Sequence, residues 1–177
     1  MRLDVRHFGD QNPGATNVFR AGNRLVGLLV LILDISKAAV PVGLAYYTLE
    51  MRGLAMFLIA TAPPLGHAFS PFLGFRGGKA IASVLGVWIG LTLWKASLAG
   101  VLFVLIGRML FDLPGWAVMF GLGGILAAVL IWFPDPLLLM VLAGQVLLLA
   151  YTHRGDLRHR PRFRSRLIHY LHLPKAE

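Results

Sequence analysis

Six apolar segments follow one another along the chain, and they restrict its fold more than any other feature. They cover residues 25–49, 53–66, 80–93, 97–111, 115–132 and 136–151. A single water-soluble core cannot absorb them, because 57% of the 177 residues are hydrophobic and only 14% are charged, whereas a soluble domain has about 25% charged residues. We therefore predict an all-α fold, a polytopic integral membrane helical bundle of about six transmembrane segments in a single domain over residues 1–177.

Three of the six segments are short for a bilayer. A membrane-spanning helix takes about 20 apolar residues, with a lower limit near 17. The segments that fall furthest below that limit are 53–66, 80–93 and 97–111. We expect them to be tilted, broken or partly re-entrant, and Pro63-Pro64 predicts a broken end for the second segment. Gly86 and Gly90 have the spacing that lets two helices approach closely, although glycine is also generally common in membrane helices.

The basic residues are distributed unevenly between the loops. If residues 1–24 lie in the cytoplasm, six crossings put fourteen of the 17 Lys and Arg residues on the cytoplasmic side, Arg52 and Lys95 outside, and Lys37 within a span. Both termini are then cytoplasmic, and residues 152–177 form a basic tail. We expect this tail to lie on an anionic leaflet, with a role in substrate binding as the alternative. The net charge of +9 thus indicates a membrane surface rather than nucleic acid.

The first polar cluster lies within residues 1–24. It reads Gly9-Asp10-Gln11-Asn12-Pro13-Gly14-Ala15-Thr16-Asn17-Val18-Phe19-Arg20. Glycine and asparagine allow left-handed backbone and direct main-chain N–H groups at an anion, and Arg20 can bind phosphate or carboxylate through two parallel hydrogen bonds. The alternative is an ordinary loop with a helix cap at Thr16 or Asn17.

The second polar cluster leads into the third apolar segment. It reads Gly66-His67-Ala68-Phe69-Ser70-Pro71-Phe72 and continues with Gly74-Phe75-Arg76-Gly77-Gly78-Lys79. Glycines followed by a lysine and a helix start predict an anion cradle of free N–H groups at the positive end of a helix dipole. It is not a Walker A loop, since Leu73 and Ala80 replace the Gly and the Ser or Thr of that motif. The alternative is a turn with two interfacial cations, and His67 alone is more typical of an interfacial residue than of a base.

The third polar cluster ends the last apolar segment. It reads Tyr151-Thr152-His153-Arg154-Gly155-Asp156. If the helix continues, His153 and Asp156 share one face, where a carboxylate can orient an imidazole as a base. A belt of interfacial residues is the alternative.

Two ionisable residues, Asp34 and Lys37, lie one helical turn apart inside the first apolar segment. Charges in a membrane are costly and usually pair or face the bundle interior. They form either a self-satisfied ion pair or a support behind the first polar cluster. The chain has no cysteine, which excludes disulfides, thiolate metal sites and a cysteine nucleophile, and we expect no metal ion and no cofactor.

At these clusters the sequence resembles the acyl-phosphate:glycerol-3-phosphate acyltransferases, the bacterial PlsY family. The family's first motif, Gly-Ser-Gly-Asn-x-Gly-Ala-Thr-Asn-x-x-Arg, is matched by Gly9, Asn12, Gly14, Ala15, Thr16, Asn17 and Arg20. The second, Gly-His-x-Phe-x-x-Phe-x-x-Phe-Lys/Arg-Gly-Gly-Lys, is matched by Gly66, His67, Phe69, Phe72, Phe75, Arg76, Gly77, Gly78 and Lys79. Asp34 and Lys37 align with an Asp-x-x-Lys motif, and His153 aligns with the histidine of His-x-x-Asn-Ile. The similarity runs from about residue 9 to residue 158.

The resemblance implies an integral enzyme of the bacterial inner membrane that transfers a fatty acyl group from acyl phosphate to glycerol 3-phosphate, giving lysophosphatidate and inorganic phosphate. Its partners are then these two substrates and the lipid bilayer, and its active-site loops are cytoplasmic. The residues expected to carry catalysis are His153, Lys79, Arg20 and Asp10. Those expected to bind substrate phosphate are Asn12, Gly14, Thr16, Asn17, His67, Arg76, Gly77, Gly78 and Asp156, with Asp34 and Lys37 behind them. The attacking hydroxyl loses its proton either to His153 or to the substrate's own phosphate.

Three features depart from the family pattern. Asp10 and Gln11 replace the serine and the next glycine of the first motif, Asp156 replaces the asparagine of the third, and the family usually has one more span before the first motif. A carboxylate at Asp10 would repel a phosphorylated substrate unless it is protonated or paired. Two alternatives therefore stay open: an acyltransferase-like membrane protein with altered substrate or lost activity, and a small anion transporter with Asp34 and Lys37 along its path.

Overall fold

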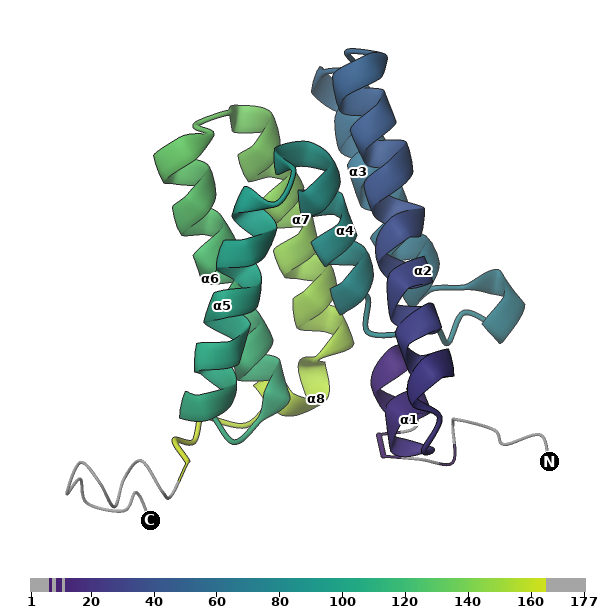
Figure 1. Ribbon diagram of the computed structural model, residues 1–177. Coiled ribbons are helices and arrows are strands. Elements are labelled where there is room, and N and C mark those ends of the chain that lie inside the picture. Colours follow the sequence, from purple (N-terminus) through teal and green to yellow (C-terminus); the bar gives the residue numbers. More distant parts are fainter. Residues whose placement is uncertain (1–6, 8, 11, 165–177) are drawn as a thin grey trace.

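The computed structural model describes residue 7, residues 9–10 and residues 12–164. In this part of the chain six long helices run roughly along a common axis (Figure 1). They are α2 (Arg24–Gly43), α3 (Gly53–Ala68), α4 (Ile81–Thr92), α5 (Lys95–Leu110), α6 (Pro114–Trp132) and α7 (Pro136–Thr152). Two short helices, α1 (Ala15–Arg20) and α8 (Arg154–Leu157), lie at the same end of the bundle (Figure 1). The described residues contain no strand, only one isolated bridge between Phe111 and Phe163.

Each predicted apolar segment corresponds to one of the six long helices, so the predicted all-α fold is confirmed. Three stretches are long and apolar enough to cross a membrane: Arg24–Thr48, Gly53–Leu73 and Pro114–Trp132. Helices α4 and α7 are apolar but shorter. Several residues of the predicted charge distribution lie outside the described residues: Arg2, Arg6, Arg166 and Lys175.

Two details of the helices differ from expectation. Helix α3 does not break at Pro63-Pro64 but continues to Ala68, because proline is tolerated in a membrane helix where other groups satisfy the carbonyl oxygens that it leaves free. The first apolar segment is α-helical only as far as Gly43 and then forms a π-helical turn, η2 (Leu44–Thr48). Hydropathy does not distinguish these local geometries.

Glycines bring α4 into direct contact with the backbone of α2. A Cβ atom added at Gly86 would overlap the carbonyl oxygen of Ile35, and one added at Gly90 would lie 2.8 Å from the carbonyl oxygen of Ala39. The small-residue spacing on α4 therefore does serve a close helix approach. This contact fixes α2 against the helix that directly follows the second polar cluster.

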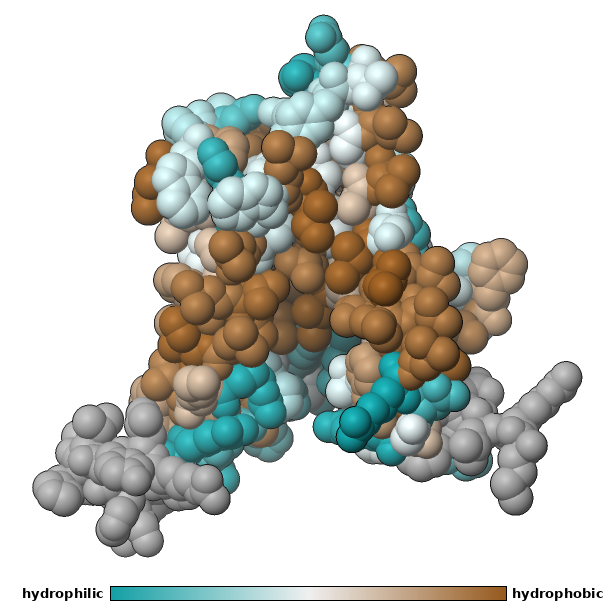
Figure 2. Space-filling view, in the orientation of Figure 1, coloured by the Kyte–Doolittle hydropathy of each residue, from teal (hydrophilic) through white to brown (hydrophobic). Residues whose placement is uncertain are grey.

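The exterior of the bundle is apolar over its middle and polar at its ends. Figure 2 shows a brown hydrophobic band around the middle, with hydrophilic residues below it and above it. Large side chains such as Leu33 on α2, Ile131 on α6 and Leu147 on α7 are exposed in the described structure. A water-soluble protein rarely exposes so large a continuous apolar surface, whereas a membrane protein presents one to lipid.

Candidate active site

The three polar clusters meet at the end of the bundle where α1 and α8 lie (Figure 1). The Asp10 carboxylate of the first cluster lies 2.7 Å from Lys79 Nζ of the second. The hydroxyl of Thr152, in the third cluster, donates a hydrogen bond to the carbonyl oxygen of Lys79 at 3.2 Å. Lys79 therefore joins clusters that lie far apart in the sequence.

Asn17 holds the first cluster together. Its buried amide donates to Asp10 Oδ1 and to the Asn12 carbonyl oxygen, both at 2.9 Å, and its oxygen accepts from Arg20 Nη1 at 3.2 Å. Gly9 has a φ of 57°, and a side chain there would collide with Asn17 and Arg20. The cluster thus forms a compact polar loop ahead of α1.

The alternative of a helix cap at Thr16 or Asn17 is wrong. Both residues lie inside α1, whose N-cap is Gly14, and no side chain caps this helix. Thr16 is exposed, as is Arg20 beyond its contact with Asn17. The side chains of this helix are therefore available for contacts other than capping.

Asp10 is a charged, paired carboxylate. Partial burial raises its pKa, but the hydrogen bond and charge of Lys79, together with the Asn17 amide, lower the pKa further, so that it lies below its ordinary value. The pairing answers the question of how a carboxylate is tolerated here. It also means that the ammonium group of Lys79 already has an anionic partner within the protein.

The predicted cradle of free N–H groups at Gly77 and Gly78 is wrong for this structure. The Gly77 N–H donates to the Ala68 carbonyl oxygen and the Gly78 N–H to that of His67, both at 3.0 Å. These glycines are required instead by close packing, because a Cβ at Gly78 would overlap the His67 ring. The two residues fix the loop to the end of α3, while Arg76 beside them is exposed.

Asp34 and Lys37 support the second cluster rather than the first. Lys37 Nζ lies 2.7 Å from Asp34 Oδ1 and 2.6 Å from His67 Nδ1, and His67 Nδ1 lies 3.3 Å from Asp34 Oδ1. The expected ion pair is present, and it includes a histidine of the second cluster. Because the His67 ring packs against Gly78, the group formed by Asp34, Lys37 and His67 contacts the loop that carries Lys79.

His153 is buried at the C-terminal end of α7. Its Nδ1 lies 2.9 Å from the Leu149 carbonyl oxygen; because a carbonyl can only accept, this contact assigns the proton to Nδ1 and the lone pair to Nε2. Burial above all lowers the pKa of His153, and the Leu149 bond opposes this only in part. The imidazole is therefore neutral at neutral pH and able to accept a proton at Nε2.

Asp156 does not orient His153 as expected. Its Oδ2 accepts a hydrogen bond of 2.7 Å from the N–H of Gly115, in the first turn of α6. A carboxylate at this position satisfies a free helix N–H group and complements the helix dipole. Asp156 therefore fastens α8 to α6, and its side chain is bound across 41 residues of sequence.

A polar pocket of about 290 Å³ opens at the junction of the second and third clusters. Its lining consists of Lys79, Thr152, His153, Arg154, Gly155, Asp156 and Arg158. Thr152, Arg154 and Arg158 were not among the predicted site residues, although the first two stand beside His153 and the third is one of the basic residues of the tail. Within the described residues, no three His, Asp or Glu side chains converge where they could hold a metal ion.

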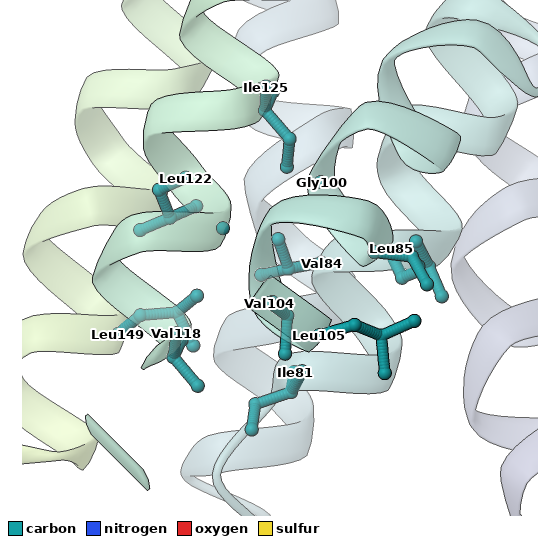
Figure 3. Close-up of a pocket in the computed structure, with 12 residues that line it drawn as sticks. Ile81, Val84, Leu85, Gly100, Val104, Leu105, Val118, Leu122, Ile125 and Leu149 are labelled. Carbon is teal, nitrogen blue, oxygen red and sulfur yellow. The ribbon is translucent and has the colours of Figure 1, made fainter. Parts of the chain in front are cut away.

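A second, apolar cavity of about 130 Å³ lies between α4, α5, α6 and α7 (Figure 3). Ile81, two residues after Lys79, lines it from α4. Leu149, whose carbonyl oxygen holds His153, lines it from α7. The apolar cavity therefore adjoins the polar site on two sides.

Together these features define a class of protein: a polytopic membrane bundle with basic residues and a neutral histidine gathered at one end. A model of the family described as glycerol-3-phosphate acyltransferase matches residues 1–160. The chain belongs to this family.

Individual relatives agree with this assignment. A glycerol-3-phosphate acyltransferase of Pseudoalteromonas translucida (strain TAC 125) is 37% identical over 158 residues, which cover 87% of this chain and 74% of the relative. One from Anaeromyxobacter sp. (strain Fw109-5) is 46% identical over 101 residues, and this alignment spans 55% of this chain and 49% of the relative.

Two crystal structures share the fold. One is PlsY, an integral membrane glycerol 3-phosphate acyltransferase, in its glycerol 3-phosphate form. The match has a TM-score of 0.77 at 25% identity and covers 98% of this chain and 87% of the PlsY chain. The other is the lysophosphatidic acid form, with a TM-score of 0.69 at 28% identity and coverages of 85% and 76%. The predicted membrane bundle and the predicted family are thereby confirmed.

Proposed function

We propose that this chain transfers a fatty acyl group from acyl phosphate to glycerol 3-phosphate, and that the product is lysophosphatidate. The observation that carries the proposal is the junction at Lys79, where the three motif-bearing loops come within hydrogen-bonding distance of one another. One small dianion can contact all three loops only if they meet in this way. Family membership supplies the class of reaction, and the acyl-phosphate donor is part of the proposal.

The phosphate groups are proposed to bind among the basic residues around Lys79. Lys79 and Arg20 supply charge from two loops, and Arg76 is exposed next to the second loop. The other residues assigned to the same task are Asn12, Gly14, Thr16, Asn17 and His67. Binding requires Asp10 to release Lys79, because the carboxylate and a phosphate would otherwise share one cation.

His153 is proposed as the base for the attacking hydroxyl. Its lone pair at Nε2 takes the hydroxyl proton, the hydroxyl oxygen bonds to the acyl carbon, and the bond from that carbon to the phosphate oxygen breaks. Phosphate leaves with the electron pair and can recover the proton, so no covalent enzyme intermediate is required. The substrate's own phosphate is the alternative acceptor; the site then only positions the reactants and stabilises charge.

The acyl chain is proposed to enter the apolar cavity of Figure 3. This cavity begins at Ile81 and Leu149, both within two to four residues of the polar side chains that would handle the phosphates. A chain in this position lies among membrane helices, while its reactive carbonyl stays at the polar end. The lining contains no charged residue, which suits a hydrocarbon tail.

The site is proposed to face the cytoplasm from the inner membrane. Most basic residues of the described chain outside the apolar segments flank this end of the bundle, whereas Arg52 and Lys95, the first residue of α5, lie at the other end. Positive residues near span ends favour the cytoplasmic side. Both termini then lie in the cytoplasm.

One observation favours a second candidate, a relative with altered substrate or lost activity. The carboxylate of Asp10 pairs with Lys79 and accepts a hydrogen bond from Asn17, so it takes two partners that we propose for substrate phosphate. The transporter alternative has less support, because Asp34 and Lys37 are satisfied by each other and by His67.

The test is acyl transfer by the purified protein in proteoliposomes, followed as the passage of label from glycerol 3-phosphate into lipid with acyl phosphate as donor. We expect activity in the unaltered protein and its loss in Lys79→Ala and Arg20→Ala. Lys95→Ala, at the opposite end of the bundle, is the matched control and should retain activity. Equal activity in all four proteins would show that the site assignment is wrong, and no activity in any would favour the second candidate.

A further inference from the structure

The loop between α3 and α4 exposes large apolar side chains. It comprises residues 70–76 and contains the short 3-10 helix η3 (Pro71–Leu73). Phe72 is 97% exposed, Phe75 67% and Leu73 43%. Two phenylalanines and a leucine at the tip of one short loop form a continuous apolar surface that water would solvate poorly.

Most backbone N–H groups of this loop donate hydrogen bonds within the protein. The N–H groups of Leu73, Gly74, Phe75 and Arg76 donate to carbonyl oxygens of the same loop at 2.9–3.2 Å. Those of the next two residues, Gly77 and Gly78, donate to the end of α3, and Pro71 has no N–H. Six consecutive donors, from Leu73 to Gly78, are therefore satisfied without water, which lowers the free-energy cost of bringing this backbone close to hydrocarbon.

The position of the loop agrees with this environment. In Figure 1 the loop projects sideways from the lower end of α3, away from the rest of the bundle. In Figure 2 it lies at the height of the brown apolar band rather than among the hydrophilic residues at the lower end of the molecule. Its apolar tip thus continues the surface that α2 and the other long helices present to lipid.

We infer that residues 70–76 form a membrane-inserted loop whose Phe72, Leu73 and Phe75 side chains lie among the acyl chains of the leaflet next to the polar site. Arg76 follows the apolar tip, and its long side chain reaches toward the headgroups. The loop returns through Gly77 and Gly78 to Lys79. Contact with lipid therefore holds in place the segment that leads into the polar site. This inference requires only that the bundle spans a bilayer and does not depend on the proposed reaction.

Because the chain has no cysteine, a single one can report the environment of the loop without background. Phe72→Cys carries an environment-sensitive fluorophore in the full-length protein, reconstituted into phosphatidylcholine–phosphatidylglycerol vesicles. Leu33→Cys on the lipid-facing side of α2 serves as the lipid control. Glu50→Cys in the exposed loop between η2 and α3 serves as the aqueous control. Phe72 packs against little of the protein, so its replacement should leave the fold intact.

We expect the probe at position 72 to match the one at position 33, with blue-shifted emission and several-fold stronger quenching by nitroxide-labelled acyl chains than at position 50. Iodide in the aqueous phase should quench it several-fold less than at position 50. Quenching by iodide to the level of position 50 would overturn the inference and leave the loop as a water-exposed surface, free for a protein partner.

Discussion

Asp10 and Asp156 are both carboxylates at positions where the family motifs have neutral residues, yet the structure uses them differently. Asp10 lies in the loop before α1 and pairs with the side chain of Lys79. Asp156 lies in α8 and accepts from the backbone N–H of Gly115. The partner of Asp10 is the cation that we propose for substrate phosphate, whereas the partner of Asp156 is the backbone N–H of a helix end. The effect of a new charge therefore depends on its partner more than on its residue type.

The largest effect is expected from removing the partner of Asp10. Lys79→Ala should reduce kcat/KM for glycerol 3-phosphate about 100-fold, the usual cost of deleting one charge-stabilising donor from an active site. Steady-state assays in proteoliposomes measure it, with Lys95→Ala as the control. If Lys79→Ala lost no more activity than this control, Lys79 would be only the structural counterpart of Asp10.

Removing Asp10 itself should have a smaller and opposite effect. Asp10→Ser frees Lys79 and Asn17, so KM for glycerol 3-phosphate should fall about fivefold, the factor equivalent to about 1 kcal/mol of exposed ion-pair energy. Substrate titration at fixed acyl phosphate measures KM, and Asp10→Asn separates charge from size. Loss of activity in both variants, with an intact fold, would instead assign Asp10 to the chemistry.

For Asp156, the expected change is in stability rather than in substrate affinity. Asp156→Ala leaves the Gly115 N–H without its acceptor and should lower the free energy of unfolding by about 1 kcal/mol, as the loss of a helix cap does. Asp156→Asn keeps an acceptor oxygen and should cost a few tenths of that. Unfolding in detergent followed by circular dichroism gives both values. Equal losses in the two variants would mean that charge, not the hydrogen bond, matters here.

The sequence was sufficient to predict the helices and the cluster positions. Apolar runs of this length have few folds other than a membrane bundle, and the distribution of basic residues put the loops of Lys79 and His153 on one side. The spacing of Gly86 and Gly90 indicated a possible close helix approach, and the structure decided between this and the general frequency of glycine in membrane helices. These predictions depend on composition and local periodicity, which are visible in a single sequence.

The partners of individual polar groups were not predictable in this way. Asp156, which accepts the hydrogen bond from the Gly115 N–H, is 41 residues from Gly115 in the sequence. His67, which contacts Lys37, is 30 residues from it. The N–H groups of Gly77 and Gly78 were expected to be free, but the end of α3 offers carbonyl oxygens at the right distance. Which of several possible partners a polar group takes is decided by packing between helices, and spacing in the sequence does not encode it.

The smallest expected effect concerns the pH dependence of the Asp10 pair. Its pKa is lowered in the folded protein by Lys79 and Asn17 against the opposing effect of burial, so its contribution to stability is present above the unfolded pKa and is lost as the pH falls through the folded pKa. Because the Asp10 side chain is 43% exposed, solvent screening keeps this contribution below about 1 kcal/mol. The unaltered protein should therefore unfold at a slightly higher temperature than Asp10→Asn at pH 7, and the difference should disappear as the pH falls through the lowered pKa of Asp10 in the folded protein. Thermal unfolding of both proteins across this range measures it; a difference that persists at the acid end would have to come from the shape of the side chain, and the contrast with Asp156 would then no longer depend on charge.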